Sequence, residues 1–230
     1  MEKVGFIGAF DKTDLILNLA KILTTIGKKV IVIDSTITQK AKYVVPVINP
    51  TASYITNFED IDVAVGFNSI EEIKKYLGTT QEDFTYDIAL IDIDNLQGLK
   101  KFEISKADKK FFVTSFDLYS LKKGLEILSE LKEPITLTKV LYAKEALKED
   151  DDYLNFLSLD YKVNWEKDII YFPIENGDLL ALYENQRVAK IKFKKLSLQY
   201  KESLVYMILG IVNTSESNVR RAIKTIERGV

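Results

Sequence analysis

Two short apolar runs without alternation constrain the fold of this chain more than any other feature. Residues 30–34 have the sequence VIVID, and residues 86–92 have the sequence YDIALID. Strands buried on both faces of a parallel sheet have continuous apolar sequences of this kind, because helices cover both sides of the sheet. Each run also ends in an aspartate, which places a carboxylate at the end of a buried strand.

The other segments alternate between strand-like and helix-like patterns along the whole chain. Strands are expected at residues 4–9, 30–34, 62–65, 86–92, 109–114, 135–142 and 168–172, and helices at residues 15–26, 69–77, 118–131 and 197–212. The acidic run at residues 149–152 predicts a surface loop. Without a Gly/Ser-rich linker, this order predicts one domain over residues 1–230, an α/β fold with a single doubly wound, mainly parallel sheet flanked by helices.

The composition excludes several classes of function. The 230 residues include no cysteine and no histidine, which excludes disulfides, thiolate metal sites and catalysis by an imidazole base. A net charge of −2 excludes a generally basic surface for nucleic acid. Since neither a signal-peptide pattern nor a long uncharged apolar run occurs, we expect a cytoplasmic protein, with peripheral binding at the inner face of the membrane as the alternative.

Positive charge is concentrated at the C-terminal end. Residues 187–230 contain ten basic and three acidic residues, a charge distribution that suits an anionic partner, whereas the favoured interpretation is a solvated, lysine-rich helix surface. Residues 218–230 predict a basic amphipathic helix, and its apolar stripe consists of Val219, Ala222, Ile223, Ile226 and Val230. This region could bind an anionic membrane or, without sequence specificity, DNA. Packing of the stripe against the protein's own domain or a second subunit is favoured, because the stripe has no Trp or Phe anchor.

A phosphate-binding loop is expected after the first strand, where Lys12 and Thr13 open the first helix. In the pattern GxxxxGK[ST], backbone N–H groups surround phosphate, the lysine contacts its oxygens and the hydroxyl binds magnesium. This chain has Phe6 and Asp11 where the pattern requires glycine. The pattern alone therefore does not identify a nucleotide site.

Five segments, in order, resemble the ParA/MinD family of deviant Walker ATPases, from residue 3 to about residue 212. The loop at residues 7–13 resembles the family motif KGGxGKTT, and residues 33–36 resemble the motif IDxD. The strand at residues 86–92 resembles the Walker B strand, and residues 107–121 resemble the motif AD…VVT.PE..S. FPIEN at residues 172–176 resembles the IPED turn that lies beside adenine in the family. The resemblance implies a P-loop NTPase-like fold, ATP and magnesium as ligands, protein partners and a homodimer.

The resemblance also implies site residues. The nucleotide would be bound by Gly8, Lys12, Thr13 and Pro173, and magnesium by Thr13, Asp34 and Asp92. Structural interpretations remain open beside these roles. Lys12 is alternatively a first-turn surface lysine paired with Asp11 or Asp14, Thr13 an ordinary helix-start residue, and the two strand-end aspartates simple caps.

Several residues depart from the family's pattern. Ile7 stands where the family has the lysine that reaches the partner's phosphates in an ATP-bound dimer. Asp11 replaces the glycine before Lys12, and like charges about 4 Å apart at an effective dielectric constant near 20 repel by about 4 kcal/mol. Asp14 adds a second acid, and Thr36 replaces the carboxylate that orients the attacking water.

These departures predict a degenerate member of the family. We expect a positioning or scaffold factor that acts through protein contacts, with ATP hydrolysis weak or absent and nucleotide binding in question. The alternative is an active, divergent ATPase in plasmid partition or in placing a pilus, flagellar or division machine.

Overall fold

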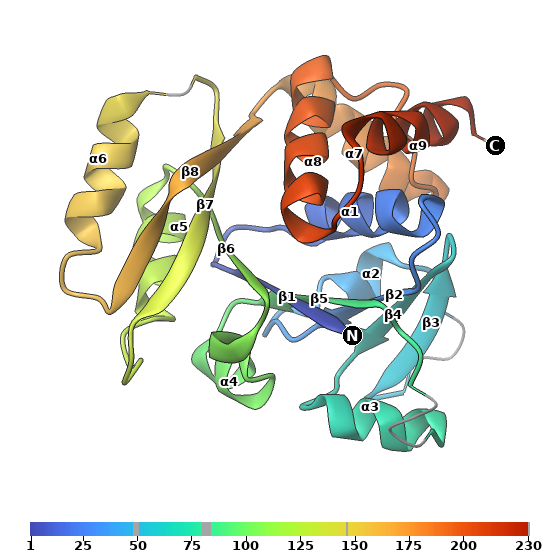
Figure 1. Ribbon diagram of the computed structural model, residues 1–230, viewed down its shortest axis with the longest axis horizontal. Helices are drawn as coiled ribbons and strands as arrows, with labels where there is room; N and C mark the ends of the chain where they lie inside the picture. Colours follow the sequence, from blue (N-terminus) through green and yellow to red (C-terminus); the bar gives the residue numbers. More distant parts are fainter. Residues whose placement is uncertain (48–50, 80–83, 146, 230) are drawn as a thin grey trace.

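An eight-stranded sheet forms the centre of the computed structural model, which describes residues 1–47, 51–79, 84–145 and 147–229 (Figure 1). The strands are β1 (Glu2–Ile7), β2 (Val30–Asp34), β3 (Tyr54–Phe58), β4 (Ile61–Val65), β5 (Ile88–Ile93), β6 (Lys109–Ser115), β7 (Ile135–Ala143) and β8 (Val163–Pro173). Their order is β3-β4-β2-β5-β1-β6-β7-β8, and only the β3–β4 pair is antiparallel. The predicted single, mainly parallel, doubly wound sheet is confirmed.

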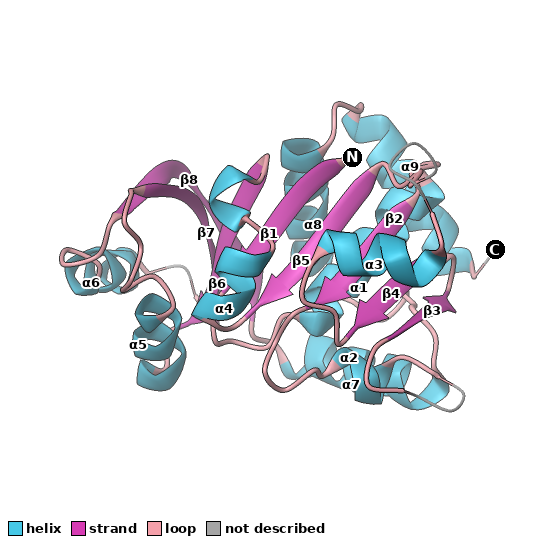
Figure 2. Ribbon diagram, turned by 90° about the horizontal axis from the view of Figure 1, so that it is seen from below, coloured by secondary structure: helices cyan, strands magenta, loops and turns pink. Residues whose placement is uncertain are grey.

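Helices cover both faces of this sheet (Figure 2). The helices on one face are α1 (Thr13–Thr25), α2 (Ala41–Val44), α7 (Asn176–Val188), α8 (Leu198–Ile211) and α9 (Glu216–Arg228). On the other face are α3 (Ile70–Leu77), α4 (Leu96–Lys101), the 3₁₀ helix η1 (Ile104–Lys106), α5 (Leu118–Glu126) and α6 (Lys148–Leu157). The buried apolar side chains accordingly form one cluster on each side of the sheet.

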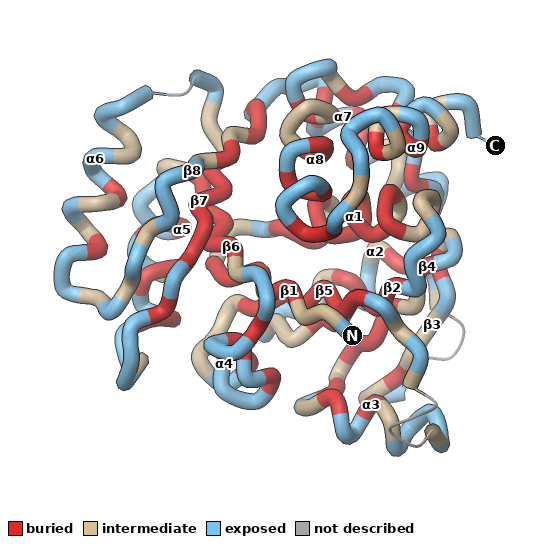
Figure 3. Tube along the Cα trace, in the orientation of Figure 1, coloured by how far each residue is buried: buried red, intermediate tan, exposed pale blue. Residues whose placement is uncertain are grey.

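The central strands are buried along their full length, as the continuous apolar runs predicted (Figure 3). Successive side chains of a strand point to opposite faces, so Phe6 lies in the cluster under α1 and Ile7 in the cluster on the opposite face. Both side chains are completely buried. Ile7 therefore fills the core within β1 and is not part of a loop.

Several boundaries differ from those expected from the sequence. The prediction of a loop at residues 149–152 is wrong, because these acids lie in α6. β1 ends at Ile7 rather than residue 9, β8 begins at Val163 rather than residue 168, and α5 ends at Glu126 rather than residue 131. β3, α2, α4 and α7 had no predicted counterpart. The first three are short, and α7 has no single apolar stripe, since Leu180 and Tyr183 on it are exposed.

The C-terminal helix α9 packs against α1 and α8. The predicted apolar stripe is buried at Val219, Ala222, Ile223 and Ile226, whereas Val230 lies outside the described residues. Packing on the protein's own domain is thus confirmed, and the hypothesis that this stripe lies on a membrane is wrong for the structure described, because the stripe is inside the protein. None of the helices in the described ranges has the length and apolar character needed to span a bilayer.

Candidate functional site

A tight loop joins β1 to α1 at the carboxyl edge of the sheet. Gly8 begins the loop with a φ of +148° and donates its N–H to the carbonyl of Ile93 at 3.0 Å. A Cβ at Gly8 would lie 2.1 Å from the carbonyl oxygen of Val113 on β6. This close approach of two backbones requires glycine, whether or not a ligand is present.

The residues that align with the phosphate-binding pattern are divided between β1 and the loop. β1 ends at Ile7 and α1 begins at Thr13, so residues 8–12 form the whole connection. The pattern GxxxxGK spans about seven residues from its first glycine through its lysine. The position expected for that first glycine holds Phe6, inside the strand. The first position of the pattern thus lies inside β1, and only part of the pattern's length lies in the loop.

Lys12 points into the protein. Its Nζ donates to the carbonyl oxygen of Gly8 at 2.8 Å and lies 2.7 Å from Oδ1 of Asp92, and only 3% of the residue is exposed. The structural alternative expected from the sequence, a surface lysine paired with Asp11 or Asp14, is therefore wrong. The structure instead joins Lys12 to Asp92, two of the predicted site residues, across the end of the sheet.

The two strand-end aspartates lie on paired positions of β2 and β5 but have different environments. Burial raises the pKa of the Asp92 carboxyl to about 6; Lys12 opposes this shift and the nearby charge of Asp34 adds to it. Asp34 accepts hydrogen bonds from Thr36 N–H at 3.0 Å, from the Thr36 hydroxyl at 2.6 Å and from Ala41 N–H at 2.9 Å. Asp34 thus caps the segment after β2.

The side chain of Asp11 accepts a hydrogen bond from the first backbone N–H of α1. Its Oδ1 accepts the N–H of Thr13 at 3.1 Å, and its Oδ2 forms an ion pair with Lys40. The amino group of Lys40 also lies 3.7 Å from Asp14, and Asp14 accepts two hydrogen bonds from the side-chain amide of Gln186 at 2.8 and 3.0 Å. Burial raises the pKa of Asp14, although Gln186 and Lys40 oppose the shift.

Lys40 is a site residue that the sequence analysis missed. It lies in the segment between β2 and α2, well separated in sequence from the loop that it contacts. Asp94 reinforces the fold of this segment by accepting the N–H of Ile37 at 2.8 and 3.1 Å, while Asp34 holds Ala41. No local spacing rule signals this contact, because it depends on the pairing of β2 with β5.

Two cavities lie at this edge of the sheet. The smaller, of about 540 Å³, is lined by the β1–α1 loop together with Thr36, Ile37, Asp92 and Asp94. The larger, of about 880 Å³, lies beside it over the ends of β7 and β8 and includes the predicted residue Pro173. Lys40 lines both cavities. The structure thus places Lys12, Thr13 and Asp92 around one cavity and Pro173 in the other.

Three of the donors that could contact a bound phosphate already have partners within the protein. The Thr13 N–H binds Asp11, Lys12 binds Asp92 and Gly8, and Lys40 binds Asp11. Among the described residues, no three carboxylates are grouped to hold a metal ion. Hydrogen bonds and ion pairs within the protein thus engage Lys12, Lys40 and the Thr13 N–H in this structure.

The sheet order, the strand-loop-helix connection after β1 and the acid-ended strands β2 and β5 define a P-loop NTPase-like α/β fold. Among solved structures with this fold, the chain is similar to a chain of the MinC:MinD cell division protein complex of Aquifex aeolicus (TM-score 0.60, 14% identity, covering 94% of this chain and 97% of that one).

Two further solved structures are similar over most of their length. They are a ParA family ATPase from Chlorobium tepidum (TM-score 0.59, 13% identity, 90% of this chain and 98% of that one) and a MinD complexed with Mg-ADP from Pyrococcus horikoshii (TM-score 0.54, 15% identity, 99% and 95%). The sequence matches no protein-family model and no curated protein sequence. The likeness therefore establishes the fold.

Proposed function

We propose that this protein is a degenerate ParA/MinD-like factor that positions or scaffolds other proteins through direct contacts, with ATP hydrolysis weak or absent. One observation carries the proposal: Lys12, the Thr13 N–H and Lys40 are all bound by carboxylates of the protein itself. A phosphate would therefore compete with carboxylates of the protein at each of these three groups.

Electrostatics supports the same proposal. Asp11 and Asp14 place two carboxylates at the start of α1, where the helix N-terminus would otherwise attract phosphate. Lys40 neutralises one of these charges. The other carboxylate would repel a phosphate by about 4 kcal/mol at a distance of about 4 Å and an effective dielectric constant of 20. This repulsion equals about half of the binding free energy of a ligand with a micromolar Kd.

Two positions of the family pattern that support ATP hydrolysis hold residues without the required charged group. The Thr36 hydroxyl donates to Asp34 and cannot act as a carboxylate base. The Ile7 side chain is buried in the core, so it can contact neither a phosphate nor a second copy of the chain. Any turnover would need other residues to orient the attacking water.

An exposed group of apolar side chains supports a protein partner at this edge of the sheet. Ile37, Tyr43 and Tyr119 surround the smaller cavity and are 75%, 79% and 70% exposed. One of the similar structures is a complex of MinD with MinC, and the fold thus occurs in a protein that binds a partner. We propose that this apolar rim contacts a protein, either a second copy of the chain or a different protein.

The second candidate function is a working, divergent ATPase. Its support is the retained arrangement of Lys12, Thr13 and Asp92 around one cavity, with Pro173 lining the neighbouring one. In this candidate, ATP with magnesium would displace the internal partners of Lys12 and Thr13. The two proposals differ in whether binding and turnover occur at all.

Isothermal titration with ATP and ADP in the presence of magnesium, followed by phosphate release on the same sample, tests the proposal. We expect no turnover, and binding no tighter than millimolar. Asp11→Gly, which restores the glycine of the pattern, is expected to bind ATP at least tenfold more tightly than the wild type but not to hydrolyse it. Turnover by the wild type that is abolished in Lys12→Ala would establish the ATPase candidate instead.

A further inference from the structure

The larger cavity has the size and the walls of a small-molecule site, irrespective of what binds at the β1–α1 loop. Its volume of about 880 Å³ lies within the usual range for ligand pockets. Its walls come from the β1–α1 loop, α1, the ends of β6, β7 and β8, and α7. The residues that follow β6, β7 and β8 complete the walls.

Aromatic rings form much of the inner wall. The rings of Phe10 and Tyr142 are 4.7 Å apart between centroids, and Tyr142 also stacks on Phe172 at 5.2 Å. Phe116 and Tyr183 add rings from two other segments. Leucine side chains complete the apolar part of the wall, at Leu15, Leu147, Leu179 and Leu182. This wall fits an apolar body of aromatic size.

The charged groups of the cavity are mainly acidic. Its lining includes two lysines, Lys40 and Lys144, and six acids: Asp11, Asp14, Asp117, Glu145, Asp150 and Asp178. Lys40 is already paired with Asp11 and lies 3.7 Å from Asp14, so a cationic ligand at Asp14 would add to the contacts that this carboxylate already makes with Lys40 and Gln186. Asp117 stays ionised because hydrogen bonds from Ser115 and Ser120 lower the pKa of its carboxyl to about 2.

The remaining acids give the cavity a negative potential, which its apolar walls strengthen by excluding water. The faces of aromatic rings also attract cations. Both effects select a ligand that carries positive charge, and both disfavour an anion such as a nucleotide. Tyr183 of α7 lines the cavity and is 53% exposed, so the cavity is accessible from solvent.

We propose that this cavity binds a small organic cation, a protonated amine attached to an aromatic-sized apolar body. The apolar body would lie among Phe10, Tyr142 and Tyr183. The ammonium group would face the acids contributed by α1 and α6, of which Asp14 and Asp150 line the cavity.

A pair of probes that differ in charge but share a ring tests this proposal. Tryptamine and indole-3-propionate carry the same indole on side chains of similar length, with opposite charges. Isothermal titration of the full-length protein should show tryptamine binding at least tenfold more tightly than indole-3-propionate. Equal affinities, stronger binding of the anion or of ATP with magnesium, or no tryptamine binding at millimolar concentration would each overturn the proposal.

Matched variants test the location. Tyr183→Ala removes a ring from the wall, and Tyr76→Ala removes an equally exposed tyrosine on α3. Asp150→Asn removes a lining charge, whereas Asp152→Asn removes a nearby charge on α6 that does not line the cavity. We expect tryptamine affinity to fall at least threefold in Tyr183→Ala and Asp150→Asn only. Unchanged affinity in both, with folding verified by circular dichroism, would place tryptamine elsewhere and overturn the proposal.

Discussion

At the residue scale, the buried pair of Lys12 and Asp92 dominates the candidate site. A buried ion pair is stabilised by attraction in a medium of low dielectric constant but loses the hydration of both ions, so its net contribution is small. Removal of one partner has a larger effect, because it leaves the other charge buried without compensation. Lys12 therefore stabilises the protein in the absence of any ligand, whereas a lysine that waits for phosphate would not.

Replacement of Lys12 tests this structural role. Lys12→Met keeps an apolar stem but leaves the buried carboxylate of Asp92 without its cation, and we expect it to lower the free energy of unfolding at pH 7 by about 3 kcal/mol. Urea denaturation measures this change. Lys123→Met is the control, because Lys123 lines the same cavity but is half-exposed. Equal stability of the two variants would contradict the role assigned to Lys12.

Asp92 also predicts a dependence of stability on pH. Burial raises the pKa of its carboxyl from 3.8 to about 6, so between these values the native state binds more protons than the unfolded state. The contribution of Asp92 to the free energy of unfolding must therefore fall as the pH rises from about 4 to about 6. Asp92→Asn removes this contribution, so the wild type should lose stability relative to the variant over this range. A difference that stays constant from pH 4 to pH 6 would refute the raised pKa.

At the element scale, a buried ion pair with the sheet stabilises α6, the helix that contains the acidic run at residues 149–152. Lys139 on β7 is 3% exposed and forms an ion pair with Asp151 of α6. Its Nζ also lies 2.6 Å from the side-chain oxygen of Asn155, one turn further along the helix, and 5.2 Å from the centre of the Trp165 ring on β8. The acids at the start of α6 also interact favourably with the helix dipole.

Neighbouring acids on α6 allow a matched test of this contact. Asp151→Ala leaves the buried Lys139 without its carboxylate, and we expect a loss of about 3 kcal/mol in the free energy of unfolding. Asp152→Ala removes the same type of side chain from an exposed position of the same helix, and thus corrects for helix propensity. Thermal or urea unfolding distinguishes them, and similar losses in both variants would show that Lys139 does not anchor α6.

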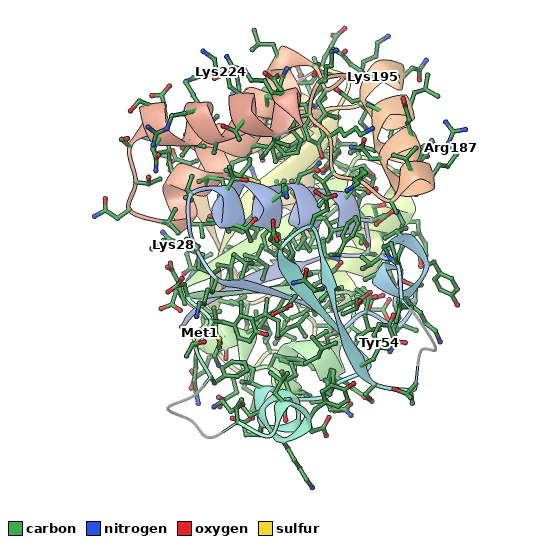
Figure 4. All side chains as sticks on the ribbon, turned by 90° about the vertical axis from the view of Figure 1, so that its right-hand side faces the viewer. Met1, Lys28, Tyr54, Arg187, Lys195 and Lys224 are labelled. Carbon is green, nitrogen blue, oxygen red and sulfur yellow. The ribbon has the colours of Figure 1, made fainter. Side chains whose placement is uncertain are left out.

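At the scale of the whole molecule, the exposed basic residues of the C-terminal region lie at one end. Arg187, Lys195 and Lys224 come from α7, the segment after it and α9, and their side chains all lie at the same end of the molecule (Figure 4). Lys192 and Lys194 in the same region are also exposed. The protein as a whole has a net charge of −2, so this end differs from the rest of the surface. Such an end attracts polyanions over a distance set by the salt concentration.

This charge distribution predicts weak, nonspecific retention on double-stranded DNA at low salt. We expect the double variant Lys192→Ala/Lys194→Ala to elute at lower salt than the wild type, because fewer phosphates are neutralised. The double variant Lys74→Ala/Lys75→Ala on α3, where Lys75 is exposed and Lys74 is half-buried over the Phe84 ring, is the control and should elute with the wild type. Elution that is independent of salt, or that is equal for both double variants, would exclude DNA as a ligand of this end.

The sequence alone was sufficient for the architecture. The local pattern of apolar residues shows which side chains are buried, as in the continuous strand VIVID and the apolar stripe of α9. This is possible because side chains on one face of a strand or helix recur with a fixed spacing in sequence. The alternation of such segments then restricts the sheet to few topologies. The central strands, the helices with a clear apolar stripe and the position of the loop before Lys12 could therefore be predicted, whereas α6 and α7 could not.

The chemistry of the loop was decided by the tertiary structure. Lys12 pairs with Asp92, Lys40 pairs with Asp11, and Lys139 pairs with Asp151 of α6. Each of these ion pairs joins residues that are well separated in sequence. The direction of a long charged side chain is not encoded in its neighbours, because several acids compete for it and burial selects among them. The sequence by itself determined where the polar groups of the site lie along the chain, whereas the packing of β1, β2 and β5 determined which of them are already paired.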